Sequence, residues 1–135
     1  MRPRVVICGS FHRDPAGLKR IFRELEATGC RILSPLSVEF IDTASAVVSS
    51  STEFDMAIEE LEKFHLRAMR DADFIWLHAP AGHVGISGAY ELGYASCLNK
   101  AIFCFEQPSD EMLLTRIRVV RSVFEALEAI DYQPL

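Results

Sequence analysis

The sequence predicts a doubly wound α/β domain in which a five-stranded parallel sheet is covered by helices on both faces, in three layers. Two observations predict this fold. Short apolar runs rich in β-branched and aromatic residues recur along the chain, and segments with helical spacing of apolar residues separate them. The pattern is clearest from Asp73 to Phe105, where a strand, a glycine-rich turn, a helix and another strand follow one another. At 135 residues, a single domain over residues 1–135 is expected.

The first third of the chain predicts a strand, a helix and a second strand. The strands are expected over Arg4–Cys8 and Arg31–Ser34. Asp14 and Pro15 are typical of an N-cap and a first helical position, and Gly29 is typical of a helix end. The apolar stripe of this helix is Leu18, Ile21, Phe22 and Leu25.

The next segment predicts a long connection and a long helix. Pro35–Thr52 is rich in small and hydroxyl residues, with Val38–Ile41 as a possible short strand, and we expect this connection to form a lid. A flexible surface insertion that does not cover the site fits its composition nearly as well. Ser50 and Glu53 have the spacing of a capping box, which opens a helix that Asp73 closes. The inward-facing stripe of this helix is Phe54, Ile58, Leu61, His65, Ala68 and Ala72.

The second half predicts three more strands and three more helices. The strands are expected over Phe74–Ala79, Ala101–Phe105 and Ile117–Val120. The other elements are expected to be a glycine-rich turn over Pro80–Gly88 with a helix to about Asn99, a short helix over Pro108–Arg116, and a last helix opened by Ser122 and Glu125.

Composition excludes several classes of protein. The net charge of −5 argues against a nucleic-acid binder. The four cysteines form no CxxC pair, and we expect no signal peptide and no membrane span, so a cytoplasmic protein is predicted. The histidines lack the spacing of a metal site, and neither a metal nor a cofactor is expected.

Glu91 is the acid on which the functional prediction depends. It is expected in the first turn of the helix that follows the third strand, at the edge of the sheet where such folds bind ligands. The helix dipole would keep it ionised, as a nucleophile requires, and the small residues around it leave room for a ligand. A solvated acid at a helix start explains the same spacing about equally well.

Two glycine-rich turns point to the same edge of the sheet. Gly9–Arg13 follows the first strand and combines backbone N–H groups, a hydroxyl and an arginine, which is typical of a phosphate cradle. Gly82–Gly88 follows the third strand. Because the first and third strands of a doubly wound sheet are neighbours, we expect the two turns to meet and form a pocket with Glu91.

The sequence resembles the nucleoside 2-deoxyribosyltransferase family, and within it the nucleotide N-glycosidase branch. The resemblance runs from Val5 to about Phe105 and is carried by CGS after the first strand, AD before the third and GAYELGYA after the glycine turn. It implies a flavodoxin-like (Rossmann-like) fold, cleavage of the bond between a base and a ribose or deoxyribose, and a homo-oligomer. The family nucleophile corresponds to Glu91. The expected substrate-binding residues are Cys8, Gly9, Ser10, His12, Arg13, His83, Gly85, Ser87 and Gly88.

Three departures from the family pattern concern the acid and the sugar contacts. The family tyrosine two residues before the cysteine is Val6 here, and an aspartate eight residues before Asp73 is His65. The turn over Ala79–Ser87 also lacks an aspartate that the transferases tend to have. His65 is therefore the expected proton donor to the leaving base, with a core histidine as an equal alternative, and His83 is the second candidate.

The expected function is cleavage of the N-glycosidic bond of a nucleoside or its 5′-monophosphate, through a covalent ester on Glu91. The expected partner is a small nucleoside or nucleotide. Hydrolysis is favoured over transfer because the turn over Gly9–Arg13 suits a phosphate. Two alternatives stay open: a nucleotide-binding module without activity, and a phosphoribohydrolase of the lysine-decarboxylase-like type, whose PGGxGTxxE motif Pro80–Glu91 resembles only loosely.

Overall fold

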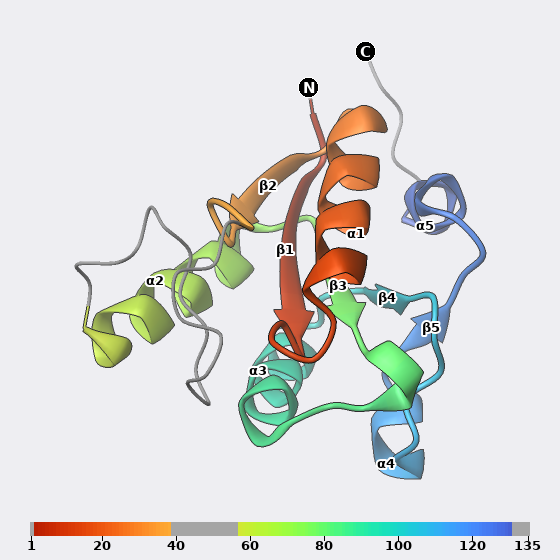
Figure 1. Ribbon diagram of the computed structural model, residues 1–135. Helices are drawn as coiled ribbons and strands as arrows, with labels where there is room; N and C mark the ends of the chain where they lie inside the picture. The colour runs from red at the N-terminus through yellow and green to blue at the C-terminus, as the bar shows by residue number, and fades with distance from the viewer. Residues whose placement is uncertain (1, 39–56, 131–135) are drawn as a thin grey trace.

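The computed structural model describes residues 2–38 and 57–130 and has a five-stranded parallel sheet at its centre (Figure 1). The strand order is β2-β1-β3-β4-β5, which is the flavodoxin-like order of doubly wound sheets and confirms the expected fold. The strands are β1 (Arg4–Gly9), β2 (Arg31–Ser34), β3 (Phe74–His78), β4 (Ile102–Cys104) and β5 (Arg118–Val119).

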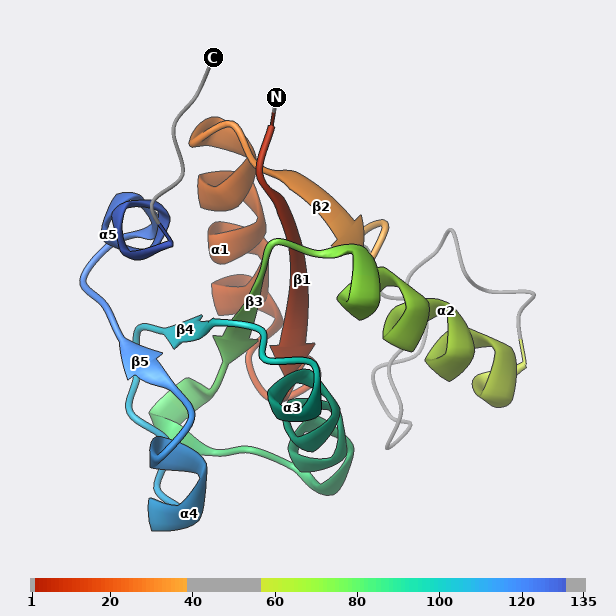
Figure 2. The ribbon, with the colours of Figure 1, turned by 180° about the vertical axis from the view of Figure 1, so that it is seen from behind.

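Helices cover both faces of this sheet. α1 and α5 lie on the face seen in Figure 1, and α2 and α3 lie on the face seen in Figure 2. This arrangement gives the three layers expected from the sequence. The helices are α1 (Pro15–Ala27), α2 (Ile58–Asp71), α3 (Ile86–Cys97), α4 (Glu111–Leu114) and α5 (Val123–Ala129).

Each face of the sheet has its own apolar core, because successive strand residues point to opposite sides. Val5 and Ile7 of β1 pack under α1 and α5, with Trp76 of β3 among their neighbours. Val6 and Cys8 pack on the other side, with buried residues of α2 and α3. β1 is buried from Val5 to Cys8, which explains why its sequence is continuously apolar rather than alternating.

The helix ends follow the sequence signals closely. The Asp14 carboxylate accepts a hydrogen bond from the Gly17 amide at the start of α1, and the Ser122 hydroxyl accepts one from the Glu125 amide at the start of α5. Gly29, after α1, has a φ of 95°, in the left-handed region that glycine adopts most easily. These three predictions are confirmed.

Several boundaries differ from the sequence expectation. α3 begins at Ile86, so Ser87 and Gly88 belong to its first turn rather than to the preceding loop. That loop contains a 3₁₀ turn over Pro80–Gly82. α2 ends at Asp71, and Asp73 lies beyond it.

The remaining differences are smaller. Ile58, expected on the inner stripe of α2, is exposed because it stands at the end of the helix, ahead of the turns that pack on the sheet. β3, β4, α4 and β5 are each one to several residues shorter than expected. The expected lid, most of the possible strand Val38–Ile41, the Ser50–Glu53 capping box and Phe54 lie outside the described residues. Among the helices that the structure describes, none has the length and apolarity to cross a membrane.

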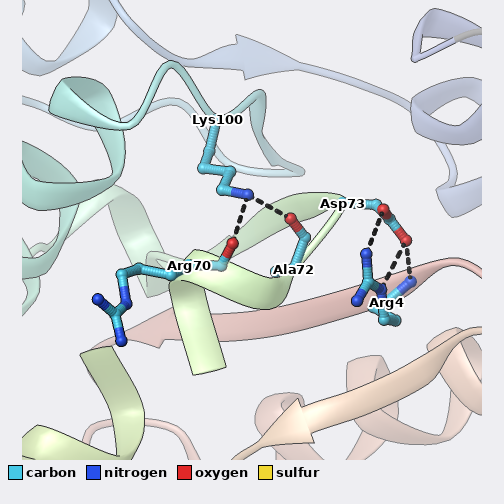
Figure 3. A network of polar contacts seen from close by, with 5 residues as sticks. All are labelled: Arg4, Arg70, Ala72, Asp73 and Lys100. Carbon is cyan, nitrogen blue, oxygen red and sulfur yellow. Dashed lines mark hydrogen bonds and ion pairs between the residues drawn. The ribbon is translucent and has the colours of Figure 1, made fainter. Parts of the chain in front are cut away.

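Polar contacts join α2, β1 and the loop before β4 at the end of the sheet opposite the C-terminal ends of the strands (Figure 3). Asp73 accepts a hydrogen bond from the backbone amide of Arg4 at 2.7 Å and pairs with its guanidinium at 3.2 Å. Lys100 Nζ donates to the carbonyl oxygens of Arg70 and Ala72, at 2.9 and 2.7 Å. A lysine at a helix C-terminus satisfies carbonyls that have no partner within the helix and complements the helix dipole. These contacts therefore fix the end of α2.

We predict that Lys100→Met lowers the free energy of unfolding by about 1–2 kcal/mol, because two carbonyls at the end of α2 lose a charged donor. Thermal melting should show a decrease of roughly 3–6 °C. Lys63→Met is the matched control, since Lys63 forms an exposed pair with Glu59 within α2. Equal melting temperatures for the two variants would contradict a role for Lys100 in holding α2.

Candidate active site

The site is organised by the parallel pairing of β1 with β3, which aligns Gly9 with His78 at the C-terminal ends of the two strands. Gly9 has a φ of 127°, and a Cβ atom there would lie 2.1 Å from the carbonyl oxygen of His78. Only glycine fits this position. The Ser10 amide donates to the same His78 oxygen, at 3.1 Å, so the chain turns tightly against β3.

The two glycine-rich turns meet, as expected. The Ser10 hydroxyl donates to the carbonyl oxygen of His83 at 3.2 Å, which links the turn after β1 to the turn after β3. A Cβ atom on Gly88 would lie 3.4 Å from the Cα atom of Gly9, so the first turn of α3 lies directly against the end of β1. The two turns and α3 therefore converge at the point where the strand order reverses, between β1 and β3.

Glu91 lies in the second turn of α3, not in the first turn as expected, because the helix begins five residues earlier, at Ile86. Its side chain points inward, and only 8% of the residue is exposed. A solvated acid at a helix start, which was the alternative interpretation, is therefore wrong. The helix dipole acts mainly within the first turn, so the side chains that face Glu91 matter more here than the dipole.

His65 is one of the side chains that face Glu91. It lies on the inward face of α2, is 8% exposed, and places its Nε2 atom 3.4 Å from Glu91 Oε1. Its Nδ1 atom is 2.7 Å from the hydroxyl oxygen of Ser34, at the end of β2. The ring is thus held from both sides, and its Nε2 atom faces Glu91. The structure brings together the two residues expected to be catalytic.

Glu62 is a third member of the site, which the sequence analysis missed. It lies one helical turn before His65 on the same side of α2, and its Oε1 atom is shielded from solvent without a hydrogen-bond donor among the described N–H and hydroxyl groups. Burial, the charge of Glu91 and a hydrogen bond with Glu91 raise the pKa of Glu62 to about 7, while His65 lowers it. The i, i+3 spacing with His65 is the sequence signal that could have identified it.

Cys8 completes the cluster from β1. Its Sγ atom is 3.5 Å from His65 Nε2 and 4.0 Å from the sulfur of Met69. Burial, the charge of Glu91 and a hydrogen bond to Glu91 raise the pKa of the Cys8 thiol well above its ordinary value. Donor atoms of Cys8, His65 and Glu91 lie within 4.8 Å of one another, which is close enough to hold a metal ion. Cys8 Sγ and Glu91 Oε1 both approach His65 Nε2, so the three side chains form one compact polar cluster.

The expected substrate-binding residues of the two turns differ in exposure. Ser10 and Gly88 are buried, and Gly85 and His83 are half-buried. The most exposed members of the set are His12, Arg13 and Ser87. The polar groups of the two turns are thus arranged from the buried end of β1 outward to solvent.

His78 has a role that the sequence analysis did not identify. Its Nε2 atom is 3.3 Å from the carbonyl oxygen of Asp14, which ties the end of β3 to the start of α1. Burial lowers the pKa of His78, although its contacts with Asp14 act in the opposite direction. His78 therefore supports the turn after β1 rather than the acid cluster.

A separate open depression of about 790 Å³ lies between α1, α5 and the ends of β4 and β5. It is lined by Glu24, Phe105, Val119, Val120, Arg121 and Glu125. None of the residues expected to bind substrate contributes to it, so it does not belong to the site around Glu91.

Comparison with solved structures identifies proteins of the same fold. The chain superposes on the CMP N-glycosidase BcmB of Clostridium botulinum with a TM-score of 0.57 and 16% identity, over 95% of this chain and 98% of that one. A 2-deoxyribosyltransferase from the psychrotolerant bacterium Bacillus psychrosaccharolyticus gives a TM-score of 0.64 and 13% identity, over 98% of each chain. A 2-desoxiribosyltransferase from Leishmania mexicana gives a TM-score of 0.57 and 14% identity, over 98% of this chain and 99% of that one.

The expectation drawn from the resemblance is thus confirmed at the level of the fold. No protein-family model and no curated protein sequence matches the chain.

We predict that Gly9→Ala destabilises the protein by about 3 kcal/mol or more, because the new methyl group meets the His78 carbonyl and the backbone must keep a positive φ. Gly93→Ala is the matched control, since a Cβ atom there contacts nothing within 4 Å and the residue lies within α3. The control should be stabilised by about 0.5–1 kcal/mol. Chemical denaturation measures both values, and a Gly9→Ala protein as stable as wild type would show that β1 and β3 do not meet as described.

Proposed function

We propose that the protein cleaves the N-glycosidic bond of a nucleoside or nucleoside 5′-monophosphate, with Glu91 as the nucleophile. The observation that carries this proposal is the buried Glu91 carboxylate beside His65, next to the two glycine-rich turns at the switch point of the sheet. Proteins with the same fold include a CMP N-glycosidase and 2-deoxyribosyltransferases, which supports this class of reaction. Glu91 is also the acid of the GAYELGYA motif.

The chemistry follows from the charge that develops on the sugar. As the bond to the base breaks, the anomeric carbon becomes positive, so a carboxylate beneath it lowers the barrier. Glu91 then forms an ester with the sugar, and water or a second base resolves this ester. His65, whose ring is fixed between Ser34 and Glu91, orients the carboxylate.

Substrate binding is assigned to the two turns. We assign a 5′-phosphate to the turn after β1, where the Ser10 backbone is fixed against β3 and His12 and Arg13 face solvent. Ser87, in the first turn of α3, adds a hydroxyl and a backbone amide on the opposite side. Because this arrangement suits a phosphate, hydrolysis of a nucleoside monophosphate is the preferred form of the reaction.

The test is a panel of nucleosides and their 5′-monophosphates, with free base measured by chromatography. Wild type should release base, faster from monophosphates, and Glu91→Gln should lower kcat by at least about 1,000-fold because the nucleophile is lost. Glu128→Gln, an exposed acid on α5, is the matched control and should keep full activity. A second base added to the assay separates transfer from hydrolysis. A protein that binds nucleotides yet releases no base is a binding module instead.

We also propose that a second copy of the chain covers the α3 face beside the site. Ile86 and Tyr90 lie one turn apart on α3 and are 92% and 63% exposed, which is unusual for a pair of large apolar side chains next to a buried acid. Tyr90 precedes Glu91 directly, so an interface here would help to close the site.

We predict that the protein is a homo-oligomer and that Tyr90→Glu shifts it toward the monomer, because a charge would be placed in an apolar contact. Light scattering during size-exclusion chromatography gives the mass of each form. Phe124→Glu, at an exposed apolar position on α5, is the matched control and should leave the mass unchanged. A monomeric wild type, or equal masses for the wild type and Tyr90→Glu, contradicts the proposed interface.

A further inference from the structure

The surroundings of Glu62 on α2 favour a protonated carboxyl group. Glu62 lies one turn before His65, whose Nε2 atom is 3.4 Å from Oε1 of Glu91 on α3. A carboxylate near a second acid, with a buried oxygen that no donor reaches, is costly unless it holds a proton. The Glu62 Oε1 atom is shielded from solvent, and no described N–H or hydroxyl group donates to it. The pair therefore stores a proton next to the expected nucleophile.

The groups that face Glu62 determine which residue keeps this proton. Glu91 faces it from α3, Cys8 from β1, and His65 from the next turn of α2. The thiol of Cys8 stays protonated, and Glu91 repels a negative charge on Glu62. With its pKa raised to about 7, Glu62 is the member of the pair that carries the proton near neutral pH.

We propose that Glu62 is the acid–base partner of Glu91: it protonates the departing base and then accepts a proton from the water that resolves the sugar ester. This inference rests on the proposed function. In the first step, a Glu91 oxygen bonds to the anomeric carbon, and the electron pair of the broken C–N bond moves to the base. The base takes the Glu62 proton and leaves neutral, and Glu62 becomes a carboxylate.

The second step returns both residues to their starting state. Water attacks the anomeric carbon, the bond to Glu91 breaks, and its electron pair restores the Glu91 carboxylate. The proton of the attacking water passes to Glu62. The sum is nucleotide plus water giving free base plus the sugar phosphate, and no other reactant is needed.

The charge of Glu91 determines when Glu62 releases its proton. Before attack, the charge of Glu91 raises the pKa of Glu62 and keeps its proton in place. Formation of the ester removes that charge, so the pKa of Glu62 falls when the base needs a proton. Glu62 is only half-buried, which leaves its side chain room to turn away from Glu91 as the sugar enters. In a retaining glycosidase the two carboxyl groups flank the bond at about 5–5.5 Å, so a small displacement suffices.

His65 is less suited to this step than the sequence suggested. Its Nδ1 atom is engaged with Ser34, and its Nε2 atom faces both Glu91 and Cys8. A ring held in this way positions Glu91. We assign it that positioning role, and the experiment compares the two residues directly.

The test uses Glu62→Gln, with Glu60→Gln, an exposed acid on the same helix, as the matched control. Two substrates are compared: the best nucleotide of the panel, and p-nitrophenyl β-D-ribofuranoside, whose leaving group departs without a proton. Glu62→Gln should lower kcat on the nucleotide by about 100-fold or more.

On the second substrate, the rate of the first release of p-nitrophenolate by Glu62→Gln should stay within about threefold of wild type. Turnover should then stall as the ester on Glu91 accumulates. Added azide, which needs no general base, should restore turnover.

Three kinetic results would overturn the proposal. Full nucleotide activity in Glu62→Gln excludes Glu62 as the acid. Equal losses on both substrates point to a structural role. The pattern expected for Glu62→Gln, found instead in His65→Gln, assigns the acid to His65.

Thermal melting tests the stored proton without any activity. Between the ordinary pKa of 4.5 and about 7, Glu62 is protonated in the folded protein and ionised in the unfolded chain. The folded state then binds more protons, so this group makes the protein less stable as the pH rises through that range. Between pH 5 and pH 8, the melting temperature of Glu62→Gln should therefore fall by less than that of Glu60→Gln.

The melts also separate the two possible failures. If wild type cleaves no substrate, the proposed function and the catalytic role of Glu62 both fail, and the melts alone report on the stored proton. If wild type is active and the two variants melt in parallel, only the Glu62 proposal fails. One zinc ion per chain in the purified protein, measured by elemental analysis, would also overturn it, because a cation rather than a proton would then neutralise the carboxyl groups.

Discussion

The parallel pairing of β1 with β3 is the constraint on which the rest of the site depends. Five residue pairs, from Val5 with Phe74 to Gly9 with His78, bring the C-terminal ends of the two strands to the same level. Each strand then leads into a glycine-rich turn, and the lack of a side chain at Gly9 lets β3 and α3 approach it. Without this approach, Glu91 on α3 could not lie beside Cys8 of β1 and His65 of α2. Strand register and glycine placement thus determine the chemistry available at this edge.

Most of the fold could be predicted from the sequence because local signals and tertiary packing agree there. The Asp14 and Ser122 caps rest on interactions within a few residues, and the apolar patterns of α1 and of the strand Arg31–Ser34 match the surfaces that these elements bury. The start of α3 was placed too late because Gly88 suggests a loop, whereas its actual role is to permit close packing against Gly9. Glycine identity alone does not distinguish these two uses.

The candidate site was predictable only in part, for a different reason. Cys8 lies in an apolar run and His65 on the apolar stripe of α2, so their burial could be inferred, whereas the sequence left a buried and a solvated Glu91 equally open. Glu62 lies among charged residues of α2, between Leu61 and Lys63, and only its i, i+3 spacing with His65 distinguishes it from the exposed Glu59 and Glu60. Its environment is created by the packing of α2 on α3, which brings Glu91 to it. A pair of acids on different helices is a tertiary property, and a single sequence does not encode it in any short pattern.

The position of Glu62 one turn before His65 also bears on how such sites diverge. A helix presents nearly the same direction every three or four residues, so an acid that moves by one turn keeps its neighbours while its position in an alignment changes. The resemblance places an aspartate where this chain has His65, and a carboxyl group appears three residues earlier instead. A position-by-position comparison would score this as two unrelated substitutions. In three dimensions the two positions lie on one face of α2, so either of them can present a carboxyl group in nearly the same direction.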